Sequence, residues 1–187
     1  MKEFRVLSPS AILGYGFPKE SFEEGMKRHP DVIACDAGSS DPGPYYLGAG
    51  ISFTDVAAVK RDLSIMIPAA IKAGIPVIVG TSGGSGATPH LEINRRLVME
   101  IAEEHHLSFK YAEISAEFDK ETIRYNLKEG RISPLGPVPE LTDKDIDEAV
   151  HIVAQMGEEP YMEALKGGAQ VIMAGRSYDP AVFASLA

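Results

Sequence analysis

Short apolar runs alternate with longer amphipathic stretches along this chain. The apolar runs are rich in β-branched residues, as is typical of buried strands in a parallel sheet. They lie at 4–7, 31–35, 75–80, 109–114, 150–154 and 170–174. Between them, apolar residues recur at steps of three and four, which predicts helices at 21–28, 55–73, 91–105 and 119–129. This alternation predicts an α/β, Rossmann-like fold, a mostly parallel sheet with helices on both faces.

Several residues mark where the predicted helices begin and end. Gly74 follows the helix at 55–73 and is a typical C-terminal stop, whereas Pro68 lies inside that helix and predicts a kink or a break. Thr142 with Asp145 resembles a capping box, and Pro160 suits the first turn of a further short helix.

Two connections are longer than the compact pattern requires, which is typical of functional or mobile segments. The segment 36–54 is rich in Gly, Pro and Tyr and starts where the second predicted strand ends, so we expect a functional role for it. The segment 131–141 holds three prolines, and a rigid surface connection explains it better. In open α/β sheets ligands bind outside the carboxyl ends of the strands, which is where candidate chemistry should be sought.

Composition narrows the class of protein. The 187 residues carry a formal net charge of −9, which repels nucleic acid and anionic lipid, so neither a nucleic-acid nor a membrane partner is expected. No apolar run approaches the roughly 18 residues of a membrane span. The one cysteine, Cys35, excludes an internal disulfide framework and is expected to be a small buried hydrophobe. These features indicate a reduced, cytoplasmic protein.

A glycine-rich segment, 80–89, follows a predicted strand and precedes a predicted helix. Its main-chain N–H groups and the helix N-terminus suit the binding of a phosphate or carboxylate. The predicted ligand-binding residues here are Ser82, Gly83, Gly84, Ser85 and Gly86. The segment lacks the lysine of a P-loop and the spacing of a dinucleotide fingerprint. A flexible turn is the alternative, and a serine nucleophile elbow is disfavoured because the helix does not follow Ser82 at once.

Carboxylates and a histidine near strand ends are the candidates for proton transfer. We predict Asp36, Glu113 and His90 as catalytic residues, with Ser39 and Ser40 as hydroxyls that contact the ligand. Glu117 is a related acid/base candidate, although a solvated carboxylate is the plainer interpretation of either glutamate.

Arg176 and Asp179 follow the last predicted strand and are further predicted ligand-binding residues. A guanidinium suits bidentate binding of a carboxylate or phosphate. The alternative is an Arg176–Asp179 pair that caps the next helix. The His, Cys and carboxylate spacing predicts no metal site, and the sequence does not indicate a cofactor.

Three segments together resemble a known family. Val77-Ile-Val-Gly-Thr-Ser-Gly-Gly-Ser-Gly-Ala-Thr-Pro89 contains the glycine-rich turn. The others are Ala154-Gln-Met-Gly-Glu-Glu-Pro-Tyr-Met-Glu-Ala-Leu-Lys-Gly-Gly-Ala169 and Val171-Ile-Met-Ala-Gly-Arg-Ser-Tyr-Asp-Pro-Ala-Val-Phe183. They resemble the N-terminal region of the acyclic terpene utilisation (AtuA) family. The resemblance implies a cytoplasmic catabolic enzyme of branched or acyclic acid breakdown, with relatives much longer than this chain, and it assigns no catalytic residue.

We therefore expect a single α/β domain over 1–187 that forms the N-terminal part of a longer protein. The apolar start of a helix at 179–187, through Val182, Phe183 and Leu186, predicts an exposed patch that a homo-oligomer or a missing C-terminal region would cover.

Two functions remain open. One is a lyase, hydratase or isomerase that acts on an anionic small carboxylate or acyl substrate, and the other is a non-catalytic ligand-binding or assembly subunit. Convergence of Asp36, Ser82, His90 and Arg176 on one pocket would favour the enzyme.

Overall fold

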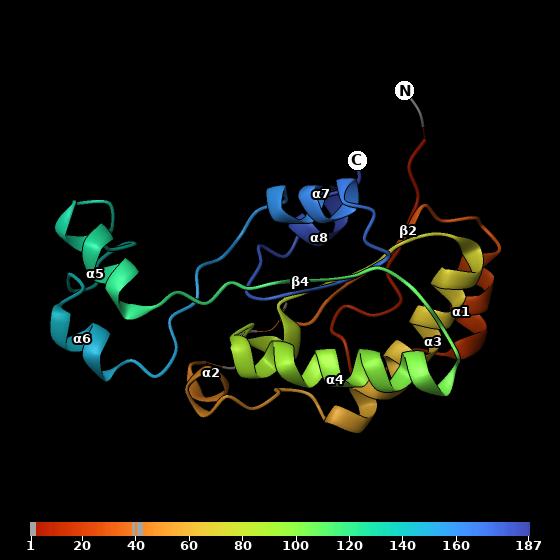
Figure 1. Cartoon of the computed structure of the whole chain (residues 1–187), viewed down its shortest axis with the longest axis horizontal. Helices are drawn as coiled ribbons and strands as arrows, with labels where there is room; N and C mark the ends of the chain where they lie inside the picture. Colours follow the sequence, from red (N-terminus) through yellow and green to blue (C-terminus); the bar gives the residue numbers. More distant parts are fainter. Residues whose placement is uncertain (1–2, 39, 41–42) are drawn as a thin grey trace.

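The computed structural model describes residues 3–38, 40 and 43–187 and contains a five-stranded sheet. The strands are β1 (Val6–Leu7), β2 (Val32–Asp36), β3 (Val77–Gly80), β4 (Tyr111–Ile114) and β5 (Val171–Ala174). Every pair of neighbouring strands is parallel, in the order β1-β2-β3-β5-β4 (Figure 1). The predicted α/β fold is therefore confirmed.

Helices cover both faces of the sheet. They are α1 (Lys19–Met26), α2 (Tyr45–Ala49), α3 (Val56–Ala73), α4 (Thr88–Glu104), α5 (Lys120–Lys128), α6 (Asp143–Glu148), α7 (Glu159–Lys166) and α8 (Ala181–Ala184). In Figure 1, α1, α3 and α4 lie on one side of the strands, and α7 and α8 lie on the other.

Alternate strand residues divide the buried core into two layers. Ile33 and Cys35 pack in the layer that holds α3 and α4, whereas Val32 and Ala34 pack with Tyr161 of α7. Successive side chains of a strand point to opposite faces, so a sheet covered on both sides needs uninterrupted apolar runs. This explains why the strands read as continuous rather than alternating hydrophobic segments.

The capping signals operate as predicted, and one helix interior differs. Gly74 ends α3 in the left-handed conformation, and Thr142 and Asp145 form a reciprocal capping box on α6. The possible break at Pro68 is wrong, because α3 is one continuous helix. Met66 and Ile67 before Pro68 and Ala70 after it are fully buried, and this packing outweighs the one hydrogen bond that proline removes.

The segment 150–154 is not a strand of the sheet, so that prediction is wrong. It runs antiparallel to 116–118 through a bridge between Glu117 and Val153, and the Phe118 N–H donates to the Ile152 carbonyl at 2.9 Å. The main chain of this segment therefore pairs with residues 116–118 and not with β4. We call these two antiparallel connections the stalk. The hydrophobic pattern of a segment indicates that it is buried, but it does not indicate which strand the segment pairs with.

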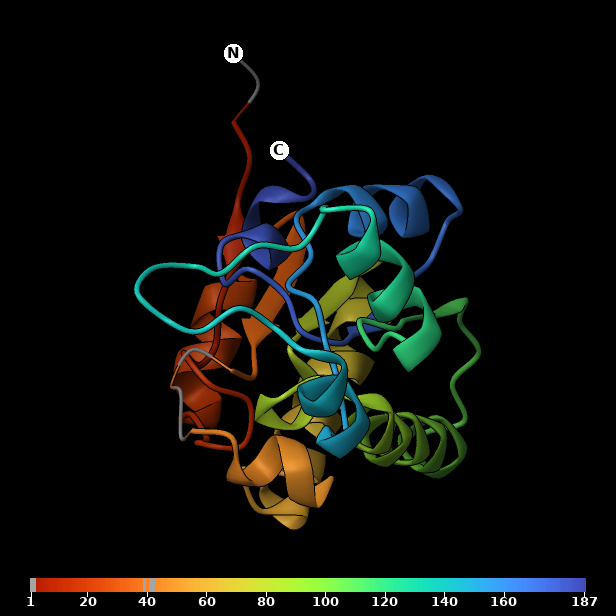
Figure 2. The same ribbon diagram turned by 90° about the vertical axis from the view of Figure 1, so that its left-hand side faces the viewer.

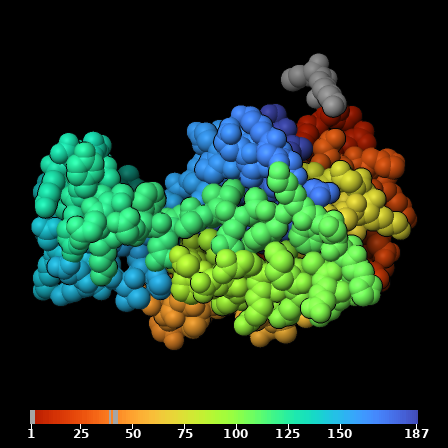
Figure 3. Space-filling model, viewed as in Figure 1, coloured from red at the N-terminus to blue at the C-terminus, as the bar shows by residue number. Residues whose placement is uncertain are grey.

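Helices α5 and α6 form a lobe that stands apart from the sheet, joined to it by this stalk (Figures 1 and 3). Ile146 is its buried apolar residue in α6, and Arg124 links the two helices through ion pairs with Asp143 and Asp147. The segment 131–141 extends from the lobe without regular structure (Figure 2).

The predicted helix near the end of the chain is present as α8. Val182 is buried, and Phe183 and Leu186 pack partly buried against the same apolar layer as Tyr161. The expected exposed patch is therefore wrong, because these three residues fold back onto the sheet. Among the described residues, no helix is both long and apolar enough to cross a membrane.

Candidate functional site

Three loops meet at the carboxyl ends of the central strands, as the sequence predicts. Strands β2, β3 and β5 are neighbours in a parallel sheet, so the segments after Asp36, Gly80 and Ala174 leave from one edge. Main-chain bonds join the loops: Ala37 donates to the Gly80 carbonyl, and Thr81 donates to the Gly175 carbonyl, each at 3.0 Å. We call this region the carboxyl edge.

A buried polar network lies under the carboxyl edge. The Tyr161 hydroxyl is 2.5 Å from the Ser177 Oγ, which in turn donates to the Gly175 carbonyl. Burial raises the pKa of the Tyr161 phenol above its ordinary value, and the Asp36 carboxylate adds to the effect. Tyr161 therefore stays neutral, and its hydroxyl joins α7 to the loop after β5 through a hydrogen bond.

Asp36, the first predicted catalytic residue, lies at the bottom of the carboxyl edge and is inaccessible to solvent. Its Oδ2 accepts a hydrogen bond from the Gly38 N–H at 3.1 Å. A Cβ on the neighbouring Gly80 would stand 3.3 Å from the Asp36 Oδ1 and 3.1 Å from the Tyr161 hydroxyl. Glycine at position 80 thus lets these two polar groups approach β3.

The glycine-rich segment is folded inward. Gly83, Gly84 and Gly86 all have positive φ, and the Gly84 and Gly86 N–H groups donate to the carbonyls of Thr81 and Ser82. These amides are thus used within the loop rather than presented to a ligand. Ser82, Gly83, Gly84, Ser85 and Gly86 are all buried, and their assignment as ligand-binding residues stays a prediction.

Close packing explains one of these glycines directly. A Cβ on Gly86 would stand 2.1 Å from the main-chain N of Arg176, which itself donates to the Gly86 carbonyl. The glycines therefore let the β3 loop contact the β5 loop. Ser82 differs from the other residues of the segment, because its buried Oγ has no hydrogen-bond partner among the described residues.

His90 links α4 to the long β2–α3 connection. Its Nδ1 accepts from the Ala87 N–H at 3.2 Å, so Nε2 carries the proton and donates to the carbonyls of Tyr46 and Ile51. Burial lowers the pKa of His90 below its ordinary value. Both nitrogens are occupied by main-chain groups, and a catalytic role for His90 stays a prediction that this geometry does not favour.

Arg176 and Asp179 lie on the loop after β5, and both are half-buried. The Arg176 guanidinium makes no hydrogen bond or ion pair with any described residue, so the alternative Arg176–Asp179 pair is not formed. Ser40 is exposed, and Ser39 lies outside the described residues.

Glu113 is the predicted catalytic residue that the fold separates from the others. It lies on β4 and contacts the Tyr111 hydroxyl at 3.0 Å and Arg95 of α4 at 3.5 Å. These contacts direct its carboxylate along the sheet toward α4 rather than toward the loops after β2, β3 and β5.

His151 is a functional candidate that the sequence analysis missed. Its Nδ1 lies 2.6 Å from the Oε1 of Glu117, the glutamate considered beside Glu113. His151 falls in the segment that was predicted as a strand, and its partner is 34 residues away. The hydrophobic pattern around it carries no signal for this pair.

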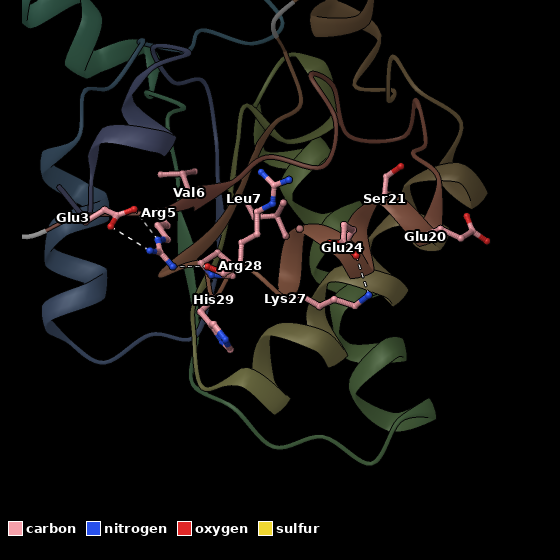
Figure 4. A pocket seen from close by; sticks show the side chains of 12 residues that line it. Glu3, Arg5, Val6, Leu7, Glu20, Ser21, Glu24, Lys27, Arg28 and His29 are labelled. Atoms are coloured by element: carbon pink, nitrogen blue, oxygen red, sulfur yellow. Dashed lines mark hydrogen bonds and ion pairs between the residues drawn. The ribbon is translucent and has the colours of Figure 1, made fainter.

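A large cavity lies away from the carboxyl edge. It has a volume of about 1020 Å³ and lies beside β1 and α1, near residues that precede β1 and β2, at the opposite end of the strands. Figure 4 shows that charges of both signs line it, with Arg5 paired to Glu3 and Lys27 to Glu24. Among the residues that the structure describes, no group of three or more His, Cys, Asp or Glu side chains could hold a metal ion.

Together, these features define an α/β protein of the doubly covered parallel-sheet class, with Asp36, the glycine-rich segment and Arg176 at the carboxyl ends of its central strands. Residues 56–187, well over half of the chain, match the model of the acyclic terpene utilisation family protein AtuA, so the chain belongs to that family. The predicted resemblance is confirmed. No curated protein and no solved structure matches the chain.

Proposed function

We propose that this chain is part of a cytoplasmic enzyme of acyclic terpene breakdown, a lyase, hydratase or isomerase that acts on a small carboxylate or acyl substrate. Family membership connects the chain with acyclic terpene utilisation. Terpene units are branched, so the acids formed from them are branched and anionic. Lyases, hydratases and isomerases of such acids act by moving a proton at a carbon near the carbonyl group.

The observation that carries this proposal is the position of Arg176. Arg176 lies half-buried on the loop after β5 at the carboxyl edge, and its guanidinium has no acidic partner among the described residues. A guanidinium presents two parallel N–H groups that match a carboxylate, and partial burial strengthens that interaction. In a protein with a net charge of −9, an arginine without an acidic partner suits an anionic ligand.

Calorimetry with 3-methylcrotonate, a small branched unsaturated acid, tests the proposal on the whole protein. Arg176→Lys should weaken binding about tenfold, because lysine keeps the charge but loses the planar fork. Arg96→Lys, on the exposed side of α4, is the matched control and should bind as the wild type does. Lack of binding by the wild-type protein, or equal affinity in Arg176→Lys, would contradict the proposal.

Exposed apolar residues on the lobe favour a second function, that of a non-catalytic ligand-binding or assembly subunit. Leu135 is 96% exposed and Val138 is 56% exposed, and Tyr125 is also exposed nearby in sequence. Large apolar side chains exposed on a projecting unit suit a surface that another protein covers, such as a second copy of this chain. Light scattering of the wild type and of Leu135→Ser tests it: an oligomer that Leu135→Ser dissociates would support this function.

A further inference from the structure

A histidine–carboxylate pair lies where the lobe joins the sheet. Glu117 comes three residues after the end of β4, and the stalk pairs it with Val153, which brings His151 alongside. The His151 Nδ1 and the Glu117 Oε1 are 2.6 Å apart. The side chains are 18% and 20% exposed, so the pair is sheltered but open to solvent.

Glu117 is held from two sides. Its Oε2 accepts the main-chain N–H of Thr88 at 2.7 Å, which is one of the unpaired donors of the first turn of α4. Burial opposes ionisation, but the hydrogen bonds from Thr88 and His151 outweigh it, and the pKa of Glu117 lies below its ordinary value. The carboxylate is therefore ionised at neutral pH and accepts from both neighbours.

An ionised carboxylate accepts hydrogen bonds and donates none, which determines the tautomer of neutral His151. The proton must lie on Nδ1, facing Glu117, and Nε2 keeps its lone pair. Nε2 has no hydrogen-bond partner among the described residues. The nearest glycine on the β2–α3 connection, Gly50, is close enough that an added Cβ would stand 3.6 Å from Nε2.

The pair also lies beside the loop that carries Arg176. A Cβ on Gly175 would stand 2.7 Å from the Ala116 Cβ, so the residues before Glu117 and before Arg176 are in contact. The segment 86–88 also joins the loop after β5 to the residues after β4. The Arg176 N–H donates to the Gly86 carbonyl, and the Thr88 N–H donates to the Glu117 carboxylate. The acid/base pair and the main chain of Arg176 therefore occupy adjacent parts of one edge.

We infer that His151 is the proton-accepting residue of this site and that Glu117 is its positioning residue, an assignment that rests on the proposed function for its substrate class. The Nε2 lone pair takes a proton from the carbon α to the substrate carbonyl, or from the γ carbon when a C=C bond lies between them. The electron pair of that C–H bond moves into the carbonyl system, and His151 becomes imidazolium. Return of the proton to another carbon completes an isomerisation, and its transfer to a departing hydroxide completes a dehydration.

The Thr88 N–H allows a sharp test through Glu117→Gln. A glutamine has one acceptor oxygen, and the main-chain N–H of Thr88 cannot turn away, so the amide oxygen should face Thr88 and the amide NH₂ should face His151. His151 Nδ1 must then accept, and the proton moves to Nε2. Long-range ¹H–¹⁵N NMR should show the Nδ1–H tautomer in the wild type and the Nε2–H tautomer in Glu117→Gln, with Glu103→Gln, an exposed carboxylate of α4, like the wild type.

Labelling with diethyl pyrocarbonate measures the same lone pair without any substrate. Nε2 attacks a carbonyl carbon of the reagent and ethyl carbonate leaves, so a histidine whose Nε2 is free is modified. Peptide mass spectrometry should find His151 labelled in the wild type and at least tenfold more slowly labelled in Glu117→Gln. An Nε2–H tautomer in the wild type, or unchanged labelling in Glu117→Gln, would overturn the inference.

Exchange of 3-methylcrotonate protons in D₂O, followed by ¹H NMR, tests the proton transfer itself. His151→Gln should abolish exchange while 3-methylcrotonate still binds, the opposite of Arg176→Lys, which should lose affinity first. His105→Gln, an exposed histidine at the end of α4, should exchange as the wild type does. Exchange that persists in His151→Gln contradicts the role of His151. If the wild-type protein does not bind 3-methylcrotonate, the proposed function is contradicted instead. The tautomer and labelling results then still decide whether the Nε2 of His151 is a free base.

Discussion

Thr81 and Ser177 form reciprocal hydrogen bonds across the carboxyl edge, although 96 residues separate them. The Ser177 N–H donates to the Thr81 Oγ1 at 3.1 Å, and that hydroxyl lies 3.4 Å from the Ser177 carbonyl. Both residues are completely buried. This contact joins the loop after β3 to the loop after β5 and keeps the glycine-rich segment beside Arg176.

Replacement of Thr81 by valine should destabilise the protein by about 1–3 kcal/mol, because a buried N–H loses its acceptor. Valine keeps the β-branched shape, so the strain of the positive φ at this position is similar in both proteins. Urea unfolding measures the loss. Thr54→Val, which removes a hydroxyl with no hydrogen bond in the described structure, should change stability by about 0.5 kcal/mol or less. Equal stability of Thr81→Val and the wild type would contradict this prediction.

Gly86→Ala should cost more stability than Gly168→Ala. Both glycines have positive φ, which costs a side chain about 1–3 kcal/mol. Only the added Cβ at Gly86 meets a main-chain atom, the Arg176 N at 2.1 Å, whereas Gly168 has nothing within 4 Å. Overpacking should add about 1–3 kcal/mol at Gly86. Thermal and urea unfolding of the two variants give the comparison, and similar losses would show that the two loops are not in close contact.

The stability of the protein should fall as the pH drops below about 6.5, the ordinary pKa of histidine, with His90 as one cause. Burial lowers the pKa of His90, so the unfolded chain binds a proton more readily than the folded chain does. The contribution of His90 is therefore complete above the unfolded pKa and is lost as protons bind the unfolded state.

Urea unfolding between pH 7.5 and 5 tests the His90 prediction against His90→Gln, which cannot titrate. The wild type should lose more stability over this range than the variant does. Glu117 has a lowered pKa too, but its contribution is lost only as pH falls below the ordinary carboxyl value of 4.5, so the two windows are separate. Parallel pH profiles for the two proteins would contradict the assignment.

Cys35 should not react with a thiol reagent while the protein is folded. It is completely buried, and burial raises the pKa of its thiol, with the carboxylates of Asp36 and Asp62 adding to the effect. The nucleophilic thiolate is therefore almost absent. Ellman's reagent should modify Cys35 only in denaturant. Ser108→Cys places a thiol at an exposed position and should react at once in the folded state, and rapid native reaction of Cys35 itself would count against its burial.

Local chemistry made some of the helix boundaries predictable. Thr142 and Asp145 form their capping box within four successive residues, and Gly74 meets a backbone requirement that glycine satisfies without a partner. The parallel sheet was predictable for a similar reason, since a strand buried on both faces must be apolar throughout. The family could also be recognised from three contiguous segments, two of which border the β3 and β5 loops.

The hydrogen-bonded pair His151–Glu117 could not be predicted from the sequence. Its hydrogen bond depends on the stalk that pairs 116–118 with 152–154, and that pairing was decided by which backbone groups lie opposite each other in space. The same limit applied to Pro68, whose helix continues because residues from distant strands pack around it.

The sequence by itself determined the class of fold, the approximate positions of the five strands of the sheet, and which loops leave the sheet at the carboxyl edge. These depend on burial patterns and caps that act within about one turn or one strand. Only the tertiary structure decided that the glycine-rich loop is folded inward, that Glu113 faces Arg95, and that Glu117 meets His151. Such pairings depend on contacts between residues far apart in the chain, for which neither composition nor spacing carries a signal.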